Sequence, residues 1–121
     1  MTFSPDNAVF HICLRQAIAD ARECGSYHAE SLAQEGFIHL SRAHQVVPTA
    51  HAYYAGVRDL VVLVIDPTQL TVPLRYEPPA PLPSNTPKPA SSELYPHCYG
   101  PIDIAAIVDV LELAHFMGVT S

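Results

Sequence analysis

The sequence LVVLVI at residues 60–65 is an uninterrupted apolar run, and Asp66-Pro67 closes it. A short run without polar interruptions is typical of a β-strand that is buried on both faces. We therefore expect residues 60–65 to form a central strand, with the other elements packed on either side of it.

The segments around this strand predict helices early in the chain and strands late. Helical spacing predicts one helix over residues 13–24, ended by Gly25, and a second from Val47 to Gly56 with Pro48 in its first turn. Further strands are expected at residues 8–12, 36–41, 72–77, 93–102 and 107–113, with a short edge strand or connection at 26–30 and a helical turn at 31–35. This inventory favours an α+β fold with two main helices over a doubly wound sheet.

The length and composition fit one domain over residues 1–121. A chain of 121 residues with 49% hydrophobic residues can bury one core, which we place at about residues 8–113. Residues 78–92 hold six of the twelve prolines and predict a long surface loop. Residues 114–121 are expected to form a loose tail.

The charge pattern excludes several classes of partner. The net charge is −6 and the six basic residues are scattered, so a nucleic-acid polymer is not expected, although a single nucleotide needs only local contacts. No apolar run is long enough to span a membrane and the N-terminus is polar, which predicts a soluble cytoplasmic protein. The three cysteines include no CxxC pair, so reduced thiols are expected rather than a disulfide framework.

Another stretch, GFIHLS, carries reactive side chains in a strand pattern. Alternation directs Ile38 and Leu40 to one side of the strand, and Phe37, His39 and Ser41 to the other. The first side is expected to be buried. The second presents an imidazole and a hydroxyl roughly 6–7 Å apart along the strand, which is close enough for both to contact one small ligand.

Other polar groups also stand in apolar strand patterns. They are His11 in the first strand, and Glu93 and His97 in the segment after the proline-rich loop. Each has a structural explanation on its own: a satisfied core histidine, a solvated carboxylate and a turn residue, while Ser41 resembles a helix cap. Together, three histidines on separate predicted strands predict one convergent site that includes His39.

Several well-known motifs are absent from the sequence. There is no GxGxxG, no GxxxxGK[ST] and no GxSxG. The metal-ligand spacings HxxxH and CxxC are absent as well, so no metal is expected. A metal-dependent hydrolase that uses three distant histidines nevertheless stays open as an alternative.

Five motifs lie along the chain: VFHI at 9–12, YHAE at 27–30, GFIHLS at 36–41, LVVLVID at 60–66 and ELYPHCYGPI at 93–102. Taken together, they resemble the DUF952 family of small uncharacterised bacterial proteins, over residues 8–113. That family is similar in fold to the ADP-ribosyltransferase superfamily, in which a split β-sheet holds NAD in a cleft. The resemblance implies a split, mostly antiparallel sheet and a site for NAD or a related nucleotide or ribosyl ligand.

The resemblance also implies roles for individual residues. His11 matches the superfamily's histidine or arginine on the first core strand, which binds the ribose and amide side of NAD. Phe37, His39 and Ser41 match the aromatic, histidine and hydroxyl residues of a later strand, and Tyr99 is expected as a further ligand contact.

The third catalytic element of the superfamily is a glutamate near the end of the fold. Glu93 is the available carboxylate, but its sequence context departs from the usual one, and His97 stands close by as the alternative. The implied catalytic set is therefore His11, His39, Glu93 and His97.

The expected activity is ribosyl or phosphoribosyl transfer with NAD as substrate or ligand. His11 and His39 would orient ribose or phosphate, Ser41 would donate a hydrogen bond, and Glu93 or His97 would stabilise developing charge. A non-catalytic small-ligand binding module stays open beside the enzyme. The natural substrate, the acceptor and the oligomeric state stay open as well.

Overall fold

The computed structural model describes residues 7–78 and 94–116. Its helices are α1 Arg15–Cys24, α2 Glu30–Glu35, α3 Val46–Tyr53 and α4 Leu113–Phe116, with 3-10 turns at Ala43–Gln45, Pro67–Gln69 and Ile104–Ala106. Its strands are β1 Val9–Leu14, β2 Ser26–Tyr27, β3 Ile38–His39, β4 Leu60–Ile65, β5 Leu74–Glu77, β6 Tyr95–Cys98, β7 Ile102–Asp103 and β8 Ile107–Glu112.

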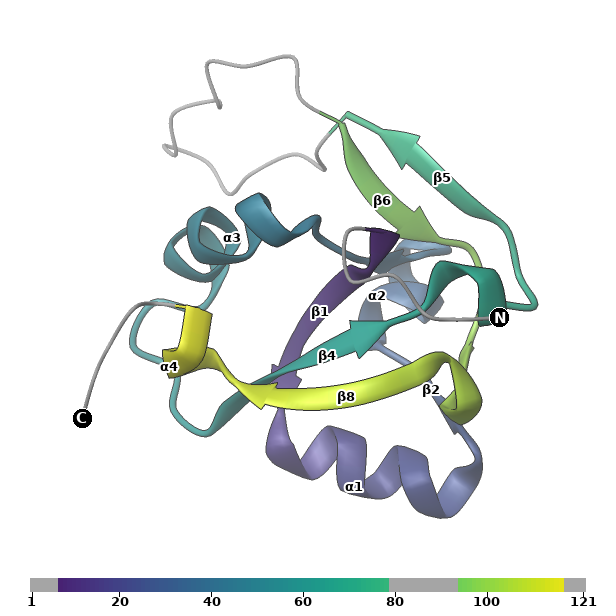
Figure 1. Cartoon of the computed structure of the whole chain (residues 1–121), viewed down its shortest axis with the longest axis horizontal. Coiled ribbons are helices and arrows are strands. Elements are labelled where there is room, and N and C mark those ends of the chain that lie inside the picture. The colour runs from purple at the N-terminus through teal and green to yellow at the C-terminus, as the bar shows by residue number, and fades with distance from the viewer. Residues whose placement is uncertain (1–6, 79–93, 117–121) are drawn as a thin grey trace.

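Strand β4 is central in the largest sheet, as its unbroken apolar run predicts. The strand order is β1-β4-β8, and all six residues of β4 are buried. The other two sheets are the pair β2-β7 and the three-stranded β3-β6-β5, in which β5 is an edge strand. Every strand pair is antiparallel, which confirms the α+β class with antiparallel sheets. Figure 1 shows β4 between β1 and β8.

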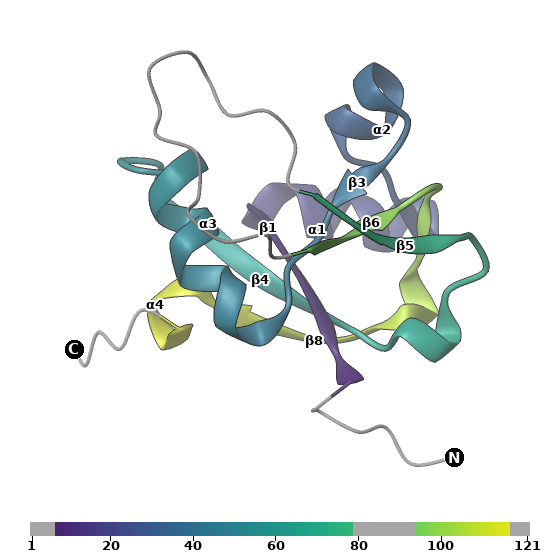
Figure 2. The same cartoon turned by 90° about the horizontal axis from the view of Figure 1, so that it is seen from above.

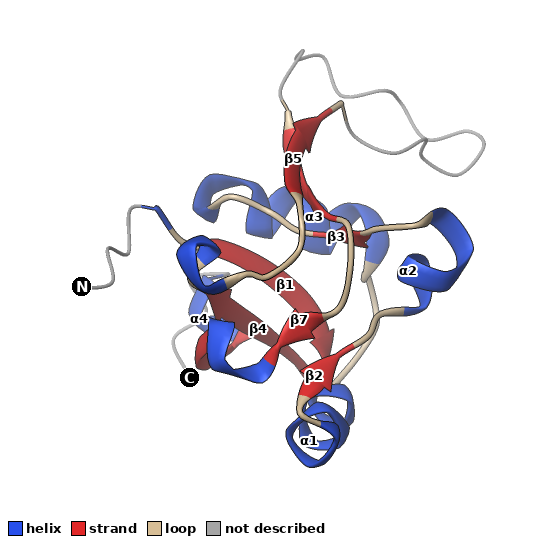
Figure 3. Ribbon diagram, turned by 90° about the vertical axis from the view of Figure 1, so that its right-hand side faces the viewer, coloured by secondary structure: helices blue, strands red, loops and turns tan. Residues whose placement is uncertain are grey.

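The two faces of β4 are buried by different elements. Leu63 packs in a cluster with Ile18 of α1 and with Ile38 of β3, whereas Val62 packs with Val46 of α3 and with α4. Because successive side chains of β4 point to opposite faces, this one strand contributes to both cores. In Figure 3, β2 and β7 lie side by side above α1, where they cover the first of these cores.

Backbone hydrogen bonds join the segment just after β3 to the largest sheet. The backbone N–H of Phe10 donates to the carbonyl of Ser41, and the N–H of Ser41 donates back to Phe10, both over 2.7 Å. The chain that follows β3 thereby pairs with the edge of β1. Figure 2 shows α2 and β3 on the side of the molecule that also carries β5 and β6. The relation to the ADP-ribosyltransferase fold stays a prediction.

The helices differ from the sequence prediction in number and in length. The turn predicted at residues 31–35 is the helix α2, and α3 ends at Tyr53 rather than at Gly56. Gly56 lies beyond that end, in the left-handed region with φ of 79°. Gly25 does end α1, with φ of 95° and its N–H donating to the carbonyl of Ala21.

The segments predicted to be irregular fall largely outside the described residues. The proline-rich stretch does so from residue 79 onward, together with Glu93 and residues 117–121. The first residues of the expected loose tail form α4, where the ring of Phe116 packs edge-on against Phe10 with centroids 5.4 Å apart. No helix among the described residues is long and apolar enough to cross a membrane.

Truncation of a side chain on the central strand β4 should destabilise the protein far more than truncation of a side chain on the neighbouring strand β1. Leu63 is fully buried in β4, so we expect Leu63→Ala to lower the free energy of unfolding by about 2–5 kcal/mol. Leu14 is 50% exposed, so Leu14→Ala should change it by only about 0.5 kcal/mol. Urea denaturation of both variants measures the difference, and equal losses would contradict the central position of β4.

Candidate functional site

One face of the β3-β6-β5 sheet collects the polar and aromatic side chains. His39 on β3 is paired with His97 on β6, and His97 is paired with Arg75 on β5. The neighbouring pair Ile38 and Cys98 is fully buried in the core. Because side chains alternate along each strand, the residues on either side of Ile38 and Cys98 lie on the opposite face.

Four rings meet on this face, and we call them the His97 cluster: Phe37, His39, His97 and Tyr99. The ring of Phe37 is stacked on that of His97 with centroids 4.3 Å apart and an interplanar angle of 23°. It also contacts His39 at 4.8 Å and Tyr99 at 5.3 Å. The two imidazoles are nearly perpendicular, with centroids 5.5 Å apart. The predicted orientation of Phe37 and His39 toward one side is confirmed.

Each imidazole of the cluster is held by a carboxylate. The Nδ1–H of His97 donates to Glu77 over 2.9 Å, and the Nε2–H of His39 donates to Glu35 over 2.7 Å. A carboxylate only accepts hydrogen bonds, so each contact fixes which ring nitrogen carries the proton. No described residue bonds the second nitrogen of either ring, Nδ1 of His39 or Nε2 of His97.

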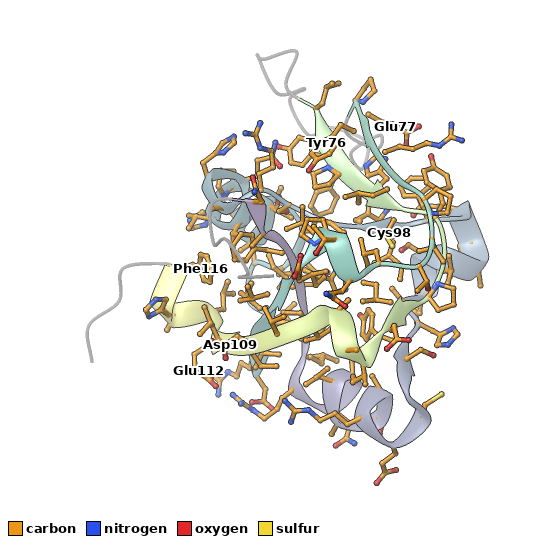
Figure 4. All side chains as sticks on the ribbon, turned by 45° about the vertical axis from the view of Figure 1, so that its right-hand side comes forward. Tyr76, Glu77, Cys98, Asp109, Glu112 and Phe116 are labelled. Carbon is orange, nitrogen blue, oxygen red and sulfur yellow. The ribbon has the colours of Figure 1, made fainter. Side chains whose placement is uncertain are left out.

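Glu77 is shared between two members of the cluster. The hydroxyl of Tyr99 donates to the same carboxylate oxygen that accepts from His97. The bond from Tyr99 is the larger cause, and that from His97 the next, of a lowered pKa for Glu77. The same bond raises the pKa of Tyr99. Glu77 therefore stays ionised. It lies on β5, well away from Phe116 of α4 (Figure 4).

A glycine ends the helix that brings Glu35 to His39. Gly36 has φ of 90°, a conformation that residues with a side chain rarely adopt, and its N–H donates to the carbonyl of Leu32. Helix α2 therefore stops at Glu35, and the chain turns directly into β3. Four residues separate the carboxylate from the imidazole that it binds, so the contact is local in sequence.

His11 lies beneath the cluster rather than in it. Its Nδ1–H donates to the backbone carbonyl of His39 over 2.7 Å, and its Nε2 accepts from the hydroxyl of Tyr27 over 2.8 Å. The ring is buried, and this desolvation lowers its pKa from 6.5 to about 4. Both nitrogens are occupied, so His11 holds the backbone of His39 in place and keeps no nitrogen for a ligand.

Ser41 is not brought together with the rings. The hydroxyl of Ser41 lies 3.3 Å from that of Thr49 on α3, while its backbone pairs with Phe10. Glu93 lies outside the described residues. Among the described residues, no three His, Cys, Asp or Glu side chains are placed to hold a metal ion together.

Sequence reasoning missed the carboxylates of the site and Arg75. Glu77 and Arg75 stand in a weakly alternating edge strand, and the sequence carries no signal that β5 pairs with β6. The sequence does carry a signal for Glu35, because it stands four residues before His39 and directly before Gly36, which ends the helix. The guanidinium of Arg75 lies over the ring of Tyr99, 5.5 Å from its centroid.

The buried His11 should make the protein sensitive to acid. Its pKa in the folded protein is about 4, whereas an unfolded histidine has about 6.5, so the unfolded chain takes up a proton first as the pH falls. The free energy of unfolding is unaffected by titration of His11 above pH 6.5. Between pH 6.5 and 4, proton uptake by His11 in the unfolded chain lowers it by roughly 3 kcal/mol, and below pH 4 this effect levels off.

Urea denaturation at pH 7.5, 6, 5 and 4.5 measures this effect. We expect the His11→Gln variant to lose less stability over this range than the unmodified protein. The slope of its free energy of unfolding against pH should be smaller by the contribution of about one proton. His51 is exposed on α3, so His51→Gln is the matched control and should keep the full slope. Identical slopes for His11→Gln and the unmodified protein would contradict the assignment.

Comparison with known proteins supports the fold. The family model described as "Protein of unknown function (DUF952)" matches residues 12–110. No curated protein matches the sequence. The crystal structure of protein CC0527 from Caulobacter crescentus is similar with a TM-score of 0.71 and 23% identity, over 85% of this chain and 82% of that one. The solution NMR structure of CC0527 gives a TM-score of 0.61 and 21% identity, over 88% and 84% of the two chains. At these identities the likeness establishes a common fold.

Proposed function

The chain belongs to the DUF952 family, a family of unknown function, and we propose that its His97 cluster binds a small ribosyl or nucleotide ligand such as NAD or ADP-ribose. What supports the proposal most is the pair of imidazoles that are each fixed by a carboxylate and each keep one nitrogen without a partner among the described residues. A histidine with a purely structural role usually has both nitrogens satisfied, as His11 has.

The surroundings of the two imidazoles suit a ligand that has both an aromatic and an anionic part. Ligand sites combine apolar and aromatic surface with a few placed polar groups. Phe37 and Tyr99 are half-buried and provide ring surface for a base or a nicotinamide. Arg75 is exposed beside Tyr99 and provides a cation for a phosphate.

The proposal assigns direct contacts to His39, His97, Phe37 and Tyr99. His11 takes a positioning role, because its ring holds the carbonyl of His39. Transfer of a ribosyl or phosphoribosyl group is the second candidate function. It is favoured by the two histidine–carboxylate pairs, since a carboxylate that orients an imidazole is a common feature of acid–base catalysis.

Ligand binding can be tested by NMR titration of the histidine side chains. We expect NAD or ADP-ribose at millimolar concentration to shift the resonances of His39 and His97 and to leave His51 unchanged. The His39→Phe variant, which keeps a ring but lacks the nitrogens, should bind more weakly by about two- to tenfold, the loss of one hydrogen bond. The His51→Gln control should bind as the unmodified protein does.

Two outcomes decide between the candidates. Absence of any shift with NAD, ADP-ribose, AMP and ribose 5-phosphate would contradict the proposed binding. Where binding is found, release of nicotinamide from NAD that depends on His39 and His97 would establish the transferase. Binding without nicotinamide release or label transfer would instead establish a non-catalytic module.

A further inference from the structure

The two carboxylates decide the chemistry that the imidazole pair offers to a ligand. Glu77 accepts the hydrogen bond from Nδ1–H of His97, so in the neutral ring Nε2 has a lone pair and no hydrogen. Glu35 accepts the hydrogen bond from Nε2–H of His39, so in the neutral ring Nδ1 likewise has a lone pair. Both nitrogens that remain are hydrogen-bond acceptors.

The two rings are neighbours, and that of His39 is partly exposed. His39 and His97 are directly paired across β3 and β6, and their ring centroids are 5.5 Å apart. The His97 residue is only 2% exposed, whereas the side chain of His39 is 39% exposed. Within residues 7–78 and 94–116, no fully buried side-chain nitrogen or oxygen lacks a hydrogen-bond partner. Neither nitrogen is among such atoms, so Nε2 of His97 keeps a small accessible surface and the ring of His39 is more open.

We infer that Nδ1 of His39 and Nε2 of His97 accept hydrogen bonds from two hydroxyl groups on adjacent carbons, which makes the imidazole pair a site for the cis-diol of a sugar. This inference rests on the proposed function and names the part of the ligand that the two histidines recognise. Two hydrogen bonds of about 2.8 Å, one from each of two neighbouring hydroxyl oxygens, span a distance compatible with rings 5.5 Å apart.

An anionic group fits the imidazole pair less well than a diol does. Phosphate and carboxylate oxygens are acceptors, and they would face two further acceptors. The carboxylates of Glu35 and Glu77 lie directly behind the rings and add like charge. The phosphate of a nucleotide would instead be placed by Arg75, on the β5 side of the cluster.

A metal ion is the other partner that two lone pairs could attract. Histidines that bind metals often donate their second N–H to a carboxylate, as these two do. Zinc sites, however, use at least three protein ligands. In the part of the chain that the structure describes, no group of three His, Cys, Asp or Glu side chains is placed for this, so the diol is favoured.

A series of nucleosides tests the inference, because it varies single hydroxyls and contains no phosphate. Affinities for adenosine, 2′-deoxyadenosine and 3′-deoxyadenosine are measured by NMR titration in the presence of EDTA. We expect each deoxy analogue to bind about two- to tenfold more weakly than adenosine, since one hydrogen bond contributes about 0.5–1.5 kcal/mol.

Variants connect this preference to the imidazole pair. In His39→Phe, one of the two deoxy analogues should bind as tightly as adenosine, because the variant lacks the nitrogen that accepts from the missing hydroxyl. The preference for adenosine should also weaken in Glu35→Gln, because a glutamine amide can donate to the imidazole and so no longer fixes its proton. Glu30→Gln, an exposed change at the start of the same helix, is the matched control and should keep the full preference.

The outcomes separate this inference from the proposed function. Equal affinities for the three nucleosides would overturn the diol site while leaving nucleotide binding intact. Absence of binding by all three, together with absence of binding by NAD and ADP-ribose, would overturn both. A hydroxyl preference that is seen without EDTA and lost with it would assign the diol to a bound metal and would overturn direct recognition by the histidines.

Discussion

The candidate site depends on one constraint, the register in which β3 pairs with β6. Ile38 faces Cys98 and His39 faces His97, and the first pair is fully buried. A slip of β3 by one residue would move Ile38 to the surface and the imidazole of His39 into the core. Burial of Ile38 and Cys98 therefore fixes the opposite face, on which Phe37 and the two histidines meet.

The register is supported from beneath by a buried neutral histidine. His11 donates to the carbonyl of His39 and accepts from Tyr27, so its ring ties β1 to both β2 and β3. Desolvation lowers its pKa to about 4 and also raises the pKa of its neighbour Cys13 to about 11. The core beneath the site is thus uncharged at neutral pH. The cost of this arrangement is a loss of stability in acid.

The sequence predicts the layers of the fold better than the partners of the site. The unbroken apolar run of β4 and the alternation around His39 are local patterns, and the structure confirms both. The contact between Glu77 and His97 joins positions twenty residues apart on paired strands, and no local pattern encodes that pairing. The resemblance assigns the third catalytic position to Glu93, which lies outside the described residues, whereas strand pairing brings Glu77 to His97.

His11 illustrates the same limit from the other side. Its position on the first strand predicts a site residue, and alternation directs it toward the face where β2 and β3 lie. Whether its two nitrogens are free or occupied depends on Tyr27 and on the backbone of His39, which sequence patterns do not reveal. The same chemical group can therefore contact a ligand or support the residue that does.

The central claim is that Glu35 and Glu77 fix the protons of the two imidazoles. Long-range nitrogen–proton NMR spectra at pH 7.5 distinguish the two tautomers of a neutral histidine. We predict that His97 carries its proton on Nδ1 and His39 on Nε2, with His97 losing its preference in Glu77→Gln. A proton on Nε2 of His97 or on Nδ1 of His39 would contradict the account.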